Sequence, residues 1–263
     1  MVLRTVIPLK RNNMTKKINK SLLLAFSLTV VMLSACEKDI KDTQQMTNDF
    51  SNLTQVQFIN AAVASTRNSI FVDAVPLNFA TIAYGGQFPA SPNSNFMVQP
   101  GLRNFQIRDT LATSLQPRLT FAENMQVNSY YTIFLYDTVT AAKQITVNTP
   151  IVVPDDTTAR VRFAHFAYLP GGAPAIDIYS VKRGANVATN VGYTQVTQFI
   201  PYASALSDTL IVRQNGTPSL ALDTLALNPT RKRSYTLVFR GRYRTNEANA
   251  AANPRVLSSY VNF

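Results

Sequence analysis

Short runs of apolar residues alternate with turn residues along most of this chain. From residue 54 onward the runs are rich in Val, Ile, Thr, Tyr and Phe, and Gly, Pro, Asn and Ser separate them. β-Branched and aromatic side chains suit the pleated, half-buried surface of a sheet, so this pattern favours strands over helices. Roughly seven strands in a hundred residues is typical of an immunoglobulin-like β-sandwich. We therefore predict an all-β fold.

The apolar runs recur in the same order after about 105 residues, which indicates a tandem duplication. The matched segments are 55–60 with 160–165, 70–73 with 178–181, 82–85 with 191–194, 105–108 with 210–213, and 131–135 with 235–239. A repeat of this length is a whole domain. We predict two tandem immunoglobulin-like β-sandwich domains, the first repeat at residues 54–153 and the second at 158–263, joined by residues 154–157.

Period two divides the last strong apolar run of the second repeat into two faces. The face expected to be buried comprises Tyr235, Leu237, Phe239 and Tyr243. The opposite face comprises Thr236, Val238, Arg240, Arg242 and Arg244. Tyr131 and Tyr235 open the strongest strand of each repeat, which is where a tyrosine corner would bind upstream backbone. An ordinary half-buried strand tyrosine is the alternative.

The N-terminal region carries the pattern of an export signal. Lys16, Lys17 and Lys20 precede an apolar stretch at residues 22–32, which is too short to span a bilayer as a helix. We assign residues 1–35 to a signal peptide. A start at the second methionine, Met14, would give a signal of ordinary proportions, so we suspect that translation begins there.

The end of this signal, Leu33-Ser34-Ala35-Cys36, contains the only cysteine and resembles the lipobox of bacterial lipoproteins. The resemblance implies acylation of the Cys36 thiol and a mature chain that begins at Cys36. Two or three acyl chains hold a protein stably on a membrane, whereas one does not. A plain signal peptide with an incidental cysteine is the alternative, although a lone cysteine then has no evident use.

Residues 36–53 are too polar to fold alone, so we interpret them as a lipidated tether. The charged start of this tether, residues 37–42, resembles the export tags of lipoproteins in Bacteroidetes-type bacteria. That resemblance implies an exported, lipid-anchored protein of the outer membrane or cell surface of a Gram-negative bacterium. A simple solvated linker is the alternative.

Removal of the signal changes the charge of the chain. The full sequence has a net charge of +11, but six basic residues and no acidic ones precede Cys36, so the mature chain carries +5. The second repeat carries +8 and the first +1. One cysteine and one histidine exclude a disulfide scaffold, a cysteine-based zinc site and a histidine cluster. We predict no cofactor.

Two segments of the second repeat, residues 159–167 and 173–179, resemble the start of the domain of unknown function 4397 family of bacterial envelope proteins. The resemblance covers most of the second repeat. The first repeat departs from it, with Asn60 in the place of His165 and Ser69 near the place of Asp177. The resemblance implies an extracytoplasmic β-sandwich and carries no known activity.

The only candidate for catalysis is His165 with Asp177, which together could form a general base. No nucleophile occupies a matching position, and Asn60 replaces the histidine in the first repeat. A core-packing histidine tolerates that replacement better than a catalytic one, so we expect a structural histidine and no catalytic residue. Asp155 and Asp156 offer too few oxygens for calcium, so we predict no metal site. The sequence therefore predicts a protein that is not an enzyme.

Two surfaces are candidates for binding. The basic one comprises Arg240, Arg242, Arg244, Arg231, Lys232 and Arg233. Such a face could hold an acidic glycan or lipid phosphates, or it could be a solvated sheet face. Nucleic acid does not suit an exported, anchored chain. The aromatic one comprises Tyr130, Thr132, Phe134 and Tyr136 of the first repeat. These side chains could bind a carbohydrate or a partner, or the other repeat could cover them.

One short motif, aspartate followed by threonine, recurs five times with an aliphatic residue or threonine behind it. The threonines are Thr110, Thr138, Thr157, Thr209 and Thr224. The motif resembles the O-glycosylation acceptors of Bacteroidetes, but Asp-Thr is also ordinary turn chemistry.

Taken with the membrane anchor, these patterns predict a non-catalytic surface lipoprotein with a structural or binding role and a glycan or envelope protein as partner. The alternative is an adhesin or acidic-glycan binder that uses the basic face of the second repeat.

Overall fold

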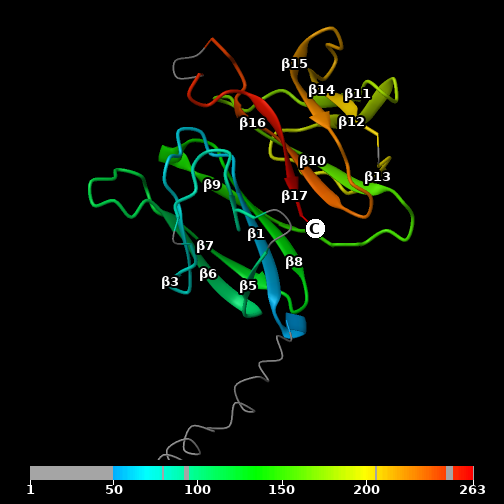
Figure 1. The fold of residues 1–263 in the computed structure, drawn as a ribbon. Helices are drawn as coiled ribbons and strands as arrows, with labels where there is room; N and C mark the ends of the chain where they lie inside the picture. The colour runs from blue at the N-terminus through cyan, green and yellow to red at the C-terminus, as the bar shows by residue number, and fades with distance from the viewer. Residues whose placement is uncertain (1–49, 79, 92–94, 205, 247–250, 263) are drawn as a thin grey trace, which may run out of the picture. The chain divides into compact units, whose positions relative to one another are not determined.

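The computed structural model describes residues 50–78, 80–91, 95–204, 206–246 and 251–262. The predicted signal, Leu33, Ser34, Ala35 and Cys36 of the lipobox, and most of the tether lie outside the described residues. Residues 50–263 form one compact unit, in which each repeat contributes two sheets (Figure 1). The predicted all-β class is confirmed, since the described helices are only short 3-10 turns.

The first repeat is a sandwich of two sheets preceded by the turn η2 (Phe50–Asn52). One sheet contains β4 (Gln87–Phe88), β5 (Phe96–Val98), β1 (Thr54–Asn60), β8 (Tyr130–Tyr136) and β9 (Lys143–Asn148). The other contains β3 (Val75–Pro76), β2 (Ser69–Val72), β6 (Gly101–Arg108) and β7 (Leu119–Met125). A second turn, η3 (Val139–Ala141), joins β8 to β9.

The second repeat follows the same plan. One sheet has the order β13 (Ile200–Tyr202), β10 (Ala159–Tyr168), β16 (Ser234–Arg242) and β17 (Val256–Val261). The other has the order β12 (Ala185–Val191), β11 (Ile176–Ser180), β14 (Asp208–Gln214) and β15 (Ala221–Leu227).

A parallel strand pair lies at the centre of one sheet in each repeat. β1 pairs with β8 with Phe58 opposite Ile133, and β10 pairs with β16 with Phe163 opposite Leu237. The two registers correspond residue for residue under the repeat offset, as expected for a duplication. Strands buried on both faces read as continuous apolar runs, which explains why β1, β10 and β16 are buried along almost their whole length.

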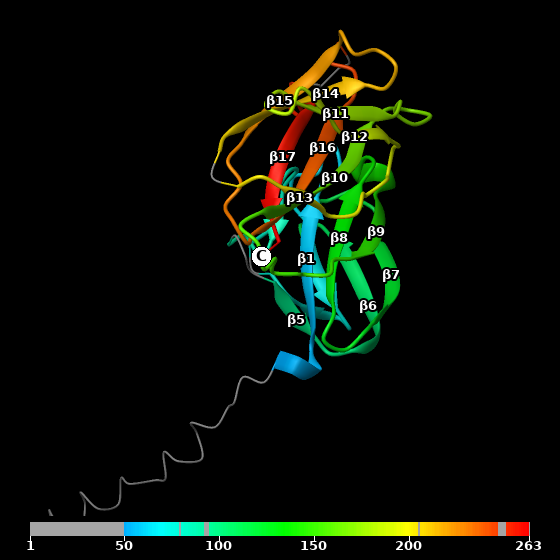
Figure 2. The same ribbon diagram turned by 90° about the vertical axis from the view of Figure 1, so that its right-hand side faces the viewer.

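Three apolar clusters account for that burial. One fills the sandwich of the first repeat, around Phe58 and Phe105, and a second fills that of the second repeat, around Phe163 and Phe239. The third lies between the sheets that contain the parallel pairs and includes Ile59, Phe134, Ala164, Phe166, Val238 and Tyr260. The sheets therefore form four successive layers, and β1 and β8 face β10, β16 and β17 (Figure 2).

Both repeats contain the predicted tyrosine corner. The Tyr131 hydroxyl accepts a hydrogen bond from the backbone N–H of Gln126 at 3.4 Å. The Tyr235 hydroxyl accepts one from the N–H of Thr230 at 3.0 Å. In each case the partner lies five residues upstream, so the bond closes the turn that leads into the central strand.

Candidate functional site

His165 is fully buried, and its hydrogen bonds to described residues go to backbone groups. Its Nε2 lies 3.0 Å from the carbonyl oxygen of Pro174, and its Nδ1 accepts the N–H of Ala167 at 3.3 Å. The ring therefore carries its proton on Nε2 and is neutral. Burial lowers the pKa of His165 to about 4, because the core disfavours the charged imidazolium.

Asp177 does not pair with His165. β10 directs His165 into the core of the second repeat, where its ring lies 5.4 Å from that of Phe239. β11 directs Ile176 and Ile178 into that core, so Asp177 between them points out of the sandwich. The Asp177 carboxylate accepts hydrogen bonds from the Asn190 backbone N–H at 2.8 Å and the Asn215 amide at 3.0 Å. The general-base pair considered from the sequence is not formed.

The sister residue Asn60 has the same structural role as His165. Its Oδ1 accepts the N–H of Ala62, two residues on, at 3.1 Å, just as His165 accepts the N–H of Ala167. Its amide donates to the carbonyl oxygen of Ile82 at 3.2 Å. Both side chains satisfy backbone groups in the C-terminal half of a buried strand, Asn60 at the last residue of β1 and His165 three residues before the end of β10, which supports the structural interpretation.

The aromatic face of the first repeat is covered by the second repeat. Phe134 is fully buried, and its ring centroid lies 4.9 Å from that of Phe166. The ring of Tyr136 lies 5.4 Å from the same phenylalanine. Of the two alternatives for this surface, coverage by the other repeat is the one that the structure shows.

A buried guanidinium holds the polar centre of the contact between repeats. Arg162 on β10 is 2% exposed. Its Nε donates to the Thr236 hydroxyl at 2.8 Å, and its Nη2 donates to the hydroxyls of Thr132 at 3.0 Å and Thr149 at 2.9 Å. The Phe199 ring centroid lies 4.7 Å from its Cζ. Burial lowers the pKa of Arg162 to about 9, so the group remains charged at pH 7.

Gln57, the counterpart of Arg162 in the first repeat, reaches in the opposite direction. Its amide donates to the carbonyl oxygen of Val261 at 2.9 Å and its Oε1 accepts from Asn262 at 2.7 Å. Each repeat thus inserts the same strand position into the other, as in an isologous contact between two copies of one domain. The repeat alignment already paired these two residues, but nothing in the local pattern indicated that they are buried.

The six basic residues of the predicted binding face do not form one surface. Arg231, Lys232 and Arg233 precede β16, whereas Arg244 follows it, and the strand between them is nine residues long. Arg240 lies between the repeats, with Cζ 4.5 Å from the Tyr84 ring centroid and Nε donating to the Tyr260 hydroxyl at 3.1 Å. Arg242 is half-buried and lines a cavity of about 590 Å³ with Tyr84 and Asn253. The expectation of an outward basic face on β16 is therefore wrong for Arg240 and Arg242, because the first repeat packs against that face.

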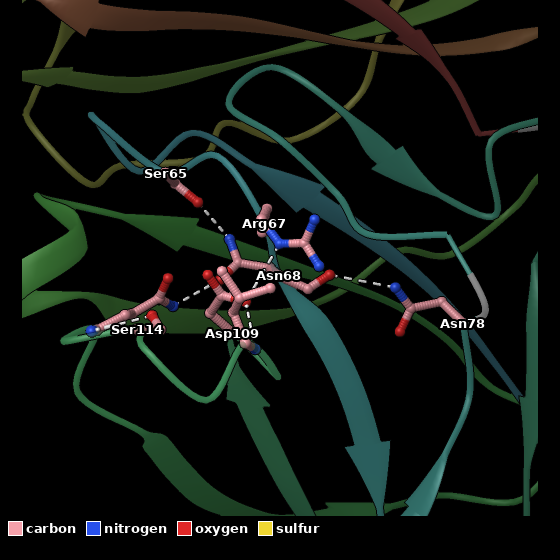
Figure 3. Close-up of polar contacts among 8 residues, drawn as sticks. Ser65, Arg67, Asn68, Asn78, Asp109 and Ser114 are labelled. Atoms are coloured by element: carbon pink, nitrogen blue, oxygen red, sulfur yellow. Dashed lines mark hydrogen bonds and ion pairs between the residues drawn. The ribbon is translucent and has the colours of Figure 1, made fainter.

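The aspartates of several Asp-Thr motifs have structural partners. Asp109 accepts hydrogen bonds from Arg67 at 3.3 Å and from the Leu111 backbone at 2.9 Å, beside the polar cluster of Ser65, Asn68 and Asn78 (Figure 3). Those bonds hold the pKa of Asp109 below its usual value, with the Leu111 N–H as the main cause. Asp208 is buried and accepts hydrogen bonds from Ser180 and Tyr202. These contacts account for the aspartates without reference to modification.

The threonines of the same motifs differ in accessibility. Thr110, Thr157, Thr209 and Thr224 are exposed. Thr138 is half-buried, and its hydroxyl lies 3.2 Å from that of Thr140.

Within the described ranges, no three His, Cys, Asp or Glu side chains come together in a way that could hold a metal ion. Asp156 caps its own turn by accepting the Thr158 N–H at 2.9 Å, and Asp155 is exposed. A search of the same ranges for a helix long and apolar enough to cross a membrane finds none.

No protein-family model and no curated protein matches this sequence. Among solved structures, the chain resembles a family 26 carbohydrate-binding module from Eubacterium rectale Amy13K, in complex with maltoheptaose, at 11% identity and a TM-score of 0.24 over 80% of this chain and 95% of that one. It also resembles a family 41 carbohydrate-binding module from streptococcal virulence factors that recognise alpha-glucan, at 7% identity and a TM-score of 0.23 over 70% and 92%. At these values the likenesses carry no argument about this chain.

Proposed function

We propose that this chain is an exported, lipid-anchored protein of the outer membrane or cell surface, in which the two β-sandwiches form a non-catalytic structural or binding module. The observation that carries the non-catalytic part is the environment of His165. The only histidine of the chain is buried, neutral and bonded to backbone, and the nearest sequence candidate for a partner, Asp177, points out of the sandwich. The lipobox resemblance of residues 33–36 supports the anchor.

The mutual insertion of Arg162 and Gln57 supports a single rigid module held away from the membrane by the polar tether. Both side chains are buried and reach across the contact between repeats. A contact that buries charged and amide groups with their partners satisfied fixes one relative arrangement of two domains. Such a module presents its outer sheets, rather than the sheets that hold the parallel pairs, to a partner.

Replacement of Cys36 with alanine tests the anchor. In cells that produce the full chain, we expect the natural protein in the membrane fraction after a high-salt wash and the variant in the soluble exported fraction. The physical reason is that two or three acyl chains bind a bilayer stably, whereas the polar tether has no affinity for it. Gln45→Ala, in the same tether, is the matched control and should remain with the membrane. A natural protein that is already soluble, or a variant that stays on the membrane, would overturn the anchor.

We further propose that the exposed Asp-Thr threonines carry O-glycans. The intact mass of the protein purified from its own cells is expected to exceed that of the acylated polypeptide, and replacement of Thr110, Thr157, Thr209 and Thr224 with alanine should remove the excess. Thr138→Ala should change the mass little, because its hydroxyl is the half-buried one. Agreement between the natural mass and that of the acylated polypeptide would end the idea.

A further inference from the structure

An arginine lies over an aromatic ring at the same place on the outer sheet of each repeat. In the first repeat, Cζ of Arg108 on β6 lies 4.6 Å from the ring centroid of Phe71 on β2. In the second, Cζ of Arg213 on β14 lies 3.9 Å from that of Tyr179 on β11. We call these pairs the two guanidinium stacks. All four side chains are half-buried and point away from the cores of their sandwiches.

The strand registers show that the two guanidinium stacks are equivalent. Phe71 lies opposite Gln106, two residues before Arg108, and Tyr179 lies opposite Ile211, two residues before Arg213. Each arginine is thus the diagonal neighbour of its ring on an antiparallel pair. Both repeats have this arrangement, although the residue opposite the ring is glutamine in the first repeat and isoleucine in the second.

Neither arginine is neutralised by a carboxylate. Among the described residues, Arg67, Arg103 and Arg160 each have an acidic partner within 4.0 Å, but no such ion pair involves Arg108 or Arg213. Within the part of the chain that the structure describes, the Nε of Arg108 is buried without a hydrogen-bond partner. Asp177 lies opposite Arg213 in the register, yet its bonds go to Asn190 and Asn215, and Ser69 has that place in the first repeat.

Most side chains around the stacks are polar, and one carboxylate, that of Asp177, lies opposite Arg213 at the second stack. Gln106 and the exposed Thr120 lie opposite each other beside the first stack. Exposed Asn186 lies opposite Tyr179, beside the second stack. An arginine that has no ion pair and lies among amides and hydroxyls matches a ligand that carries isolated negative charges between many hydroxyl groups. A nucleic acid or an anionic bilayer, with its dense charge, would instead favour several neighbouring cations.

We propose that each guanidinium stack binds one carboxylate of an acidic polysaccharide, such as a uronic-acid polymer. The aromatic ring orients the planar guanidinium and leaves its N–H edge for a carboxylate, which it can bind through two parallel hydrogen bonds. The amides and hydroxyls around it bind the neighbouring sugar hydroxyls. This inference rests on the proposed function as a binding module, and it places the binding site on the outer sheets rather than on β16.

The layer order adds a consequence for valency. The sheets with the parallel pairs pack against each other, so the two outer sheets lie at opposite ends of the four layers. One short glycan therefore cannot occupy both stacks. A long acidic polymer therefore binds several copies of the protein, and each copy of the protein binds two polymer strands.

Titration calorimetry of the mature protein in detergent with a galacturonic-acid hexamer tests the proposal. We expect two hexamers per chain for the natural protein and one for each of Arg108→Ala and Arg213→Ala. The double variant should bind at least about tenfold more weakly, since a hydrogen-bonded charged group is lost at each site. Arg108→Lys keeps the charge but not the planar fork, and should also lose most of the binding at its stack. Arg103→Ala removes the same charge from an arginine that is paired with Asp73, and it should keep two sites.

Three comparison ligands test whether the stacks prefer the carboxylates of an acidic glycan to a neutral glycan, to free phosphate and to a lipid headgroup. A neutral maltose-type hexamer, inorganic phosphate and vesicles containing phosphatidylglycerol are expected to bind at least about tenfold more weakly than the acidic hexamer. Absence of hexamer binding, an unchanged stoichiometry in the double variant, or preference for the neutral hexamer, phosphate or vesicles would each overturn the proposal. None of these outcomes changes the membrane fractionation of the Cys36→Ala variant, so failure here is distinct from failure of the anchor.

Discussion

Replacement of Arg162 with alanine is expected to lower the free energy of unfolding by about 3 kcal/mol. The side chain is 2% exposed and donates three hydrogen bonds, to Thr132, Thr149 and Thr236. Its loss leaves buried threonine hydroxyls with fewer donors and a cavity beside Phe199. The relief of a desolvated charge offsets part of this cost, which keeps the estimate below the sum of three charged hydrogen bonds.

Two further variants separate the buried contact from a general loss of charge. Arg160→Ala removes an arginine from the same strand, but that side chain is only half-buried and lies 3.9 Å from Asp156, so we expect a change below about 1 kcal/mol. Arg162→Gln introduces the residue that the first repeat uses at this position, and it should cost less than alanine because an amide can still donate to one threonine. Urea unfolding followed by circular dichroism gives all three values. Equal effects of Arg160→Ala and Arg162→Ala would contradict the assigned role.

The protein is expected to lose about 3 kcal/mol of stability between pH 6.5 and pH 4 through His165 alone. Burial lowers the pKa of His165 from 6.5 to about 4. Below pH 6.5 the unfolded chain therefore takes up a proton that the folded protein does not accept until about pH 4. Acid stabilises the unfolded state across that window, so this contribution to stability is complete above pH 6.5 and is lost as the pH falls.

His165→Asn is the matched variant, because Asn60 has the equivalent place in the first repeat. Its free energy of unfolding should vary much less between pH 6.5 and 4 than that of the natural protein. The carboxylates whose pKa values are lowered by hydrogen bonds, including Asp73 and Asp109, lose their contributions mainly below their usual value of 3.8 and do so in both proteins. Parallel pH profiles for the two proteins would show that His165 is not the group that titrates.

Several features were predictable because they depend on residues close in the sequence. The alternation in residues 235–244 identified Tyr235, Leu237 and Phe239 as the core side of β16, and all three are buried there. The tyrosine corners depend on a turn and the strand after it, so position alone identified Tyr131 and Tyr235 as candidates. The hydrogen bonds of their hydroxyls decided against the alternative of an ordinary strand tyrosine. The repeat offset predicted that the central strands of both halves correspond, and their registers do.

The alternation of side chains along a strand shows which of them share a face, but it does not show what covers that face. The sequence therefore predicted that Arg240 and Arg242 belong to a solvated basic surface, whereas in the structure the first repeat packs against them. Asp177 lies twelve residues after His165, yet it alternates with the inward-facing Ile176 and Ile178 on β11 and therefore points outward. Sequence separation carries no information about which side of a second strand a residue occupies until the core side of that strand is known.

By itself, the sequence determined the all-β class, the duplication, the core side of the strongest strands and the resemblance of residues 33–36 to a lipobox, because each depends on local order or on comparison of the chain with itself. Only the tertiary structure decided that the two sandwiches pack through their parallel-paired sheets. That packing buries Arg162 and Gln57, encloses the aromatic face of the first repeat and removes the predicted basic face from solvent. It also leaves the guanidinium stacks on the outer sheets, because side chains from strands β2 and β6, or β11 and β14, meet only once those strands have paired.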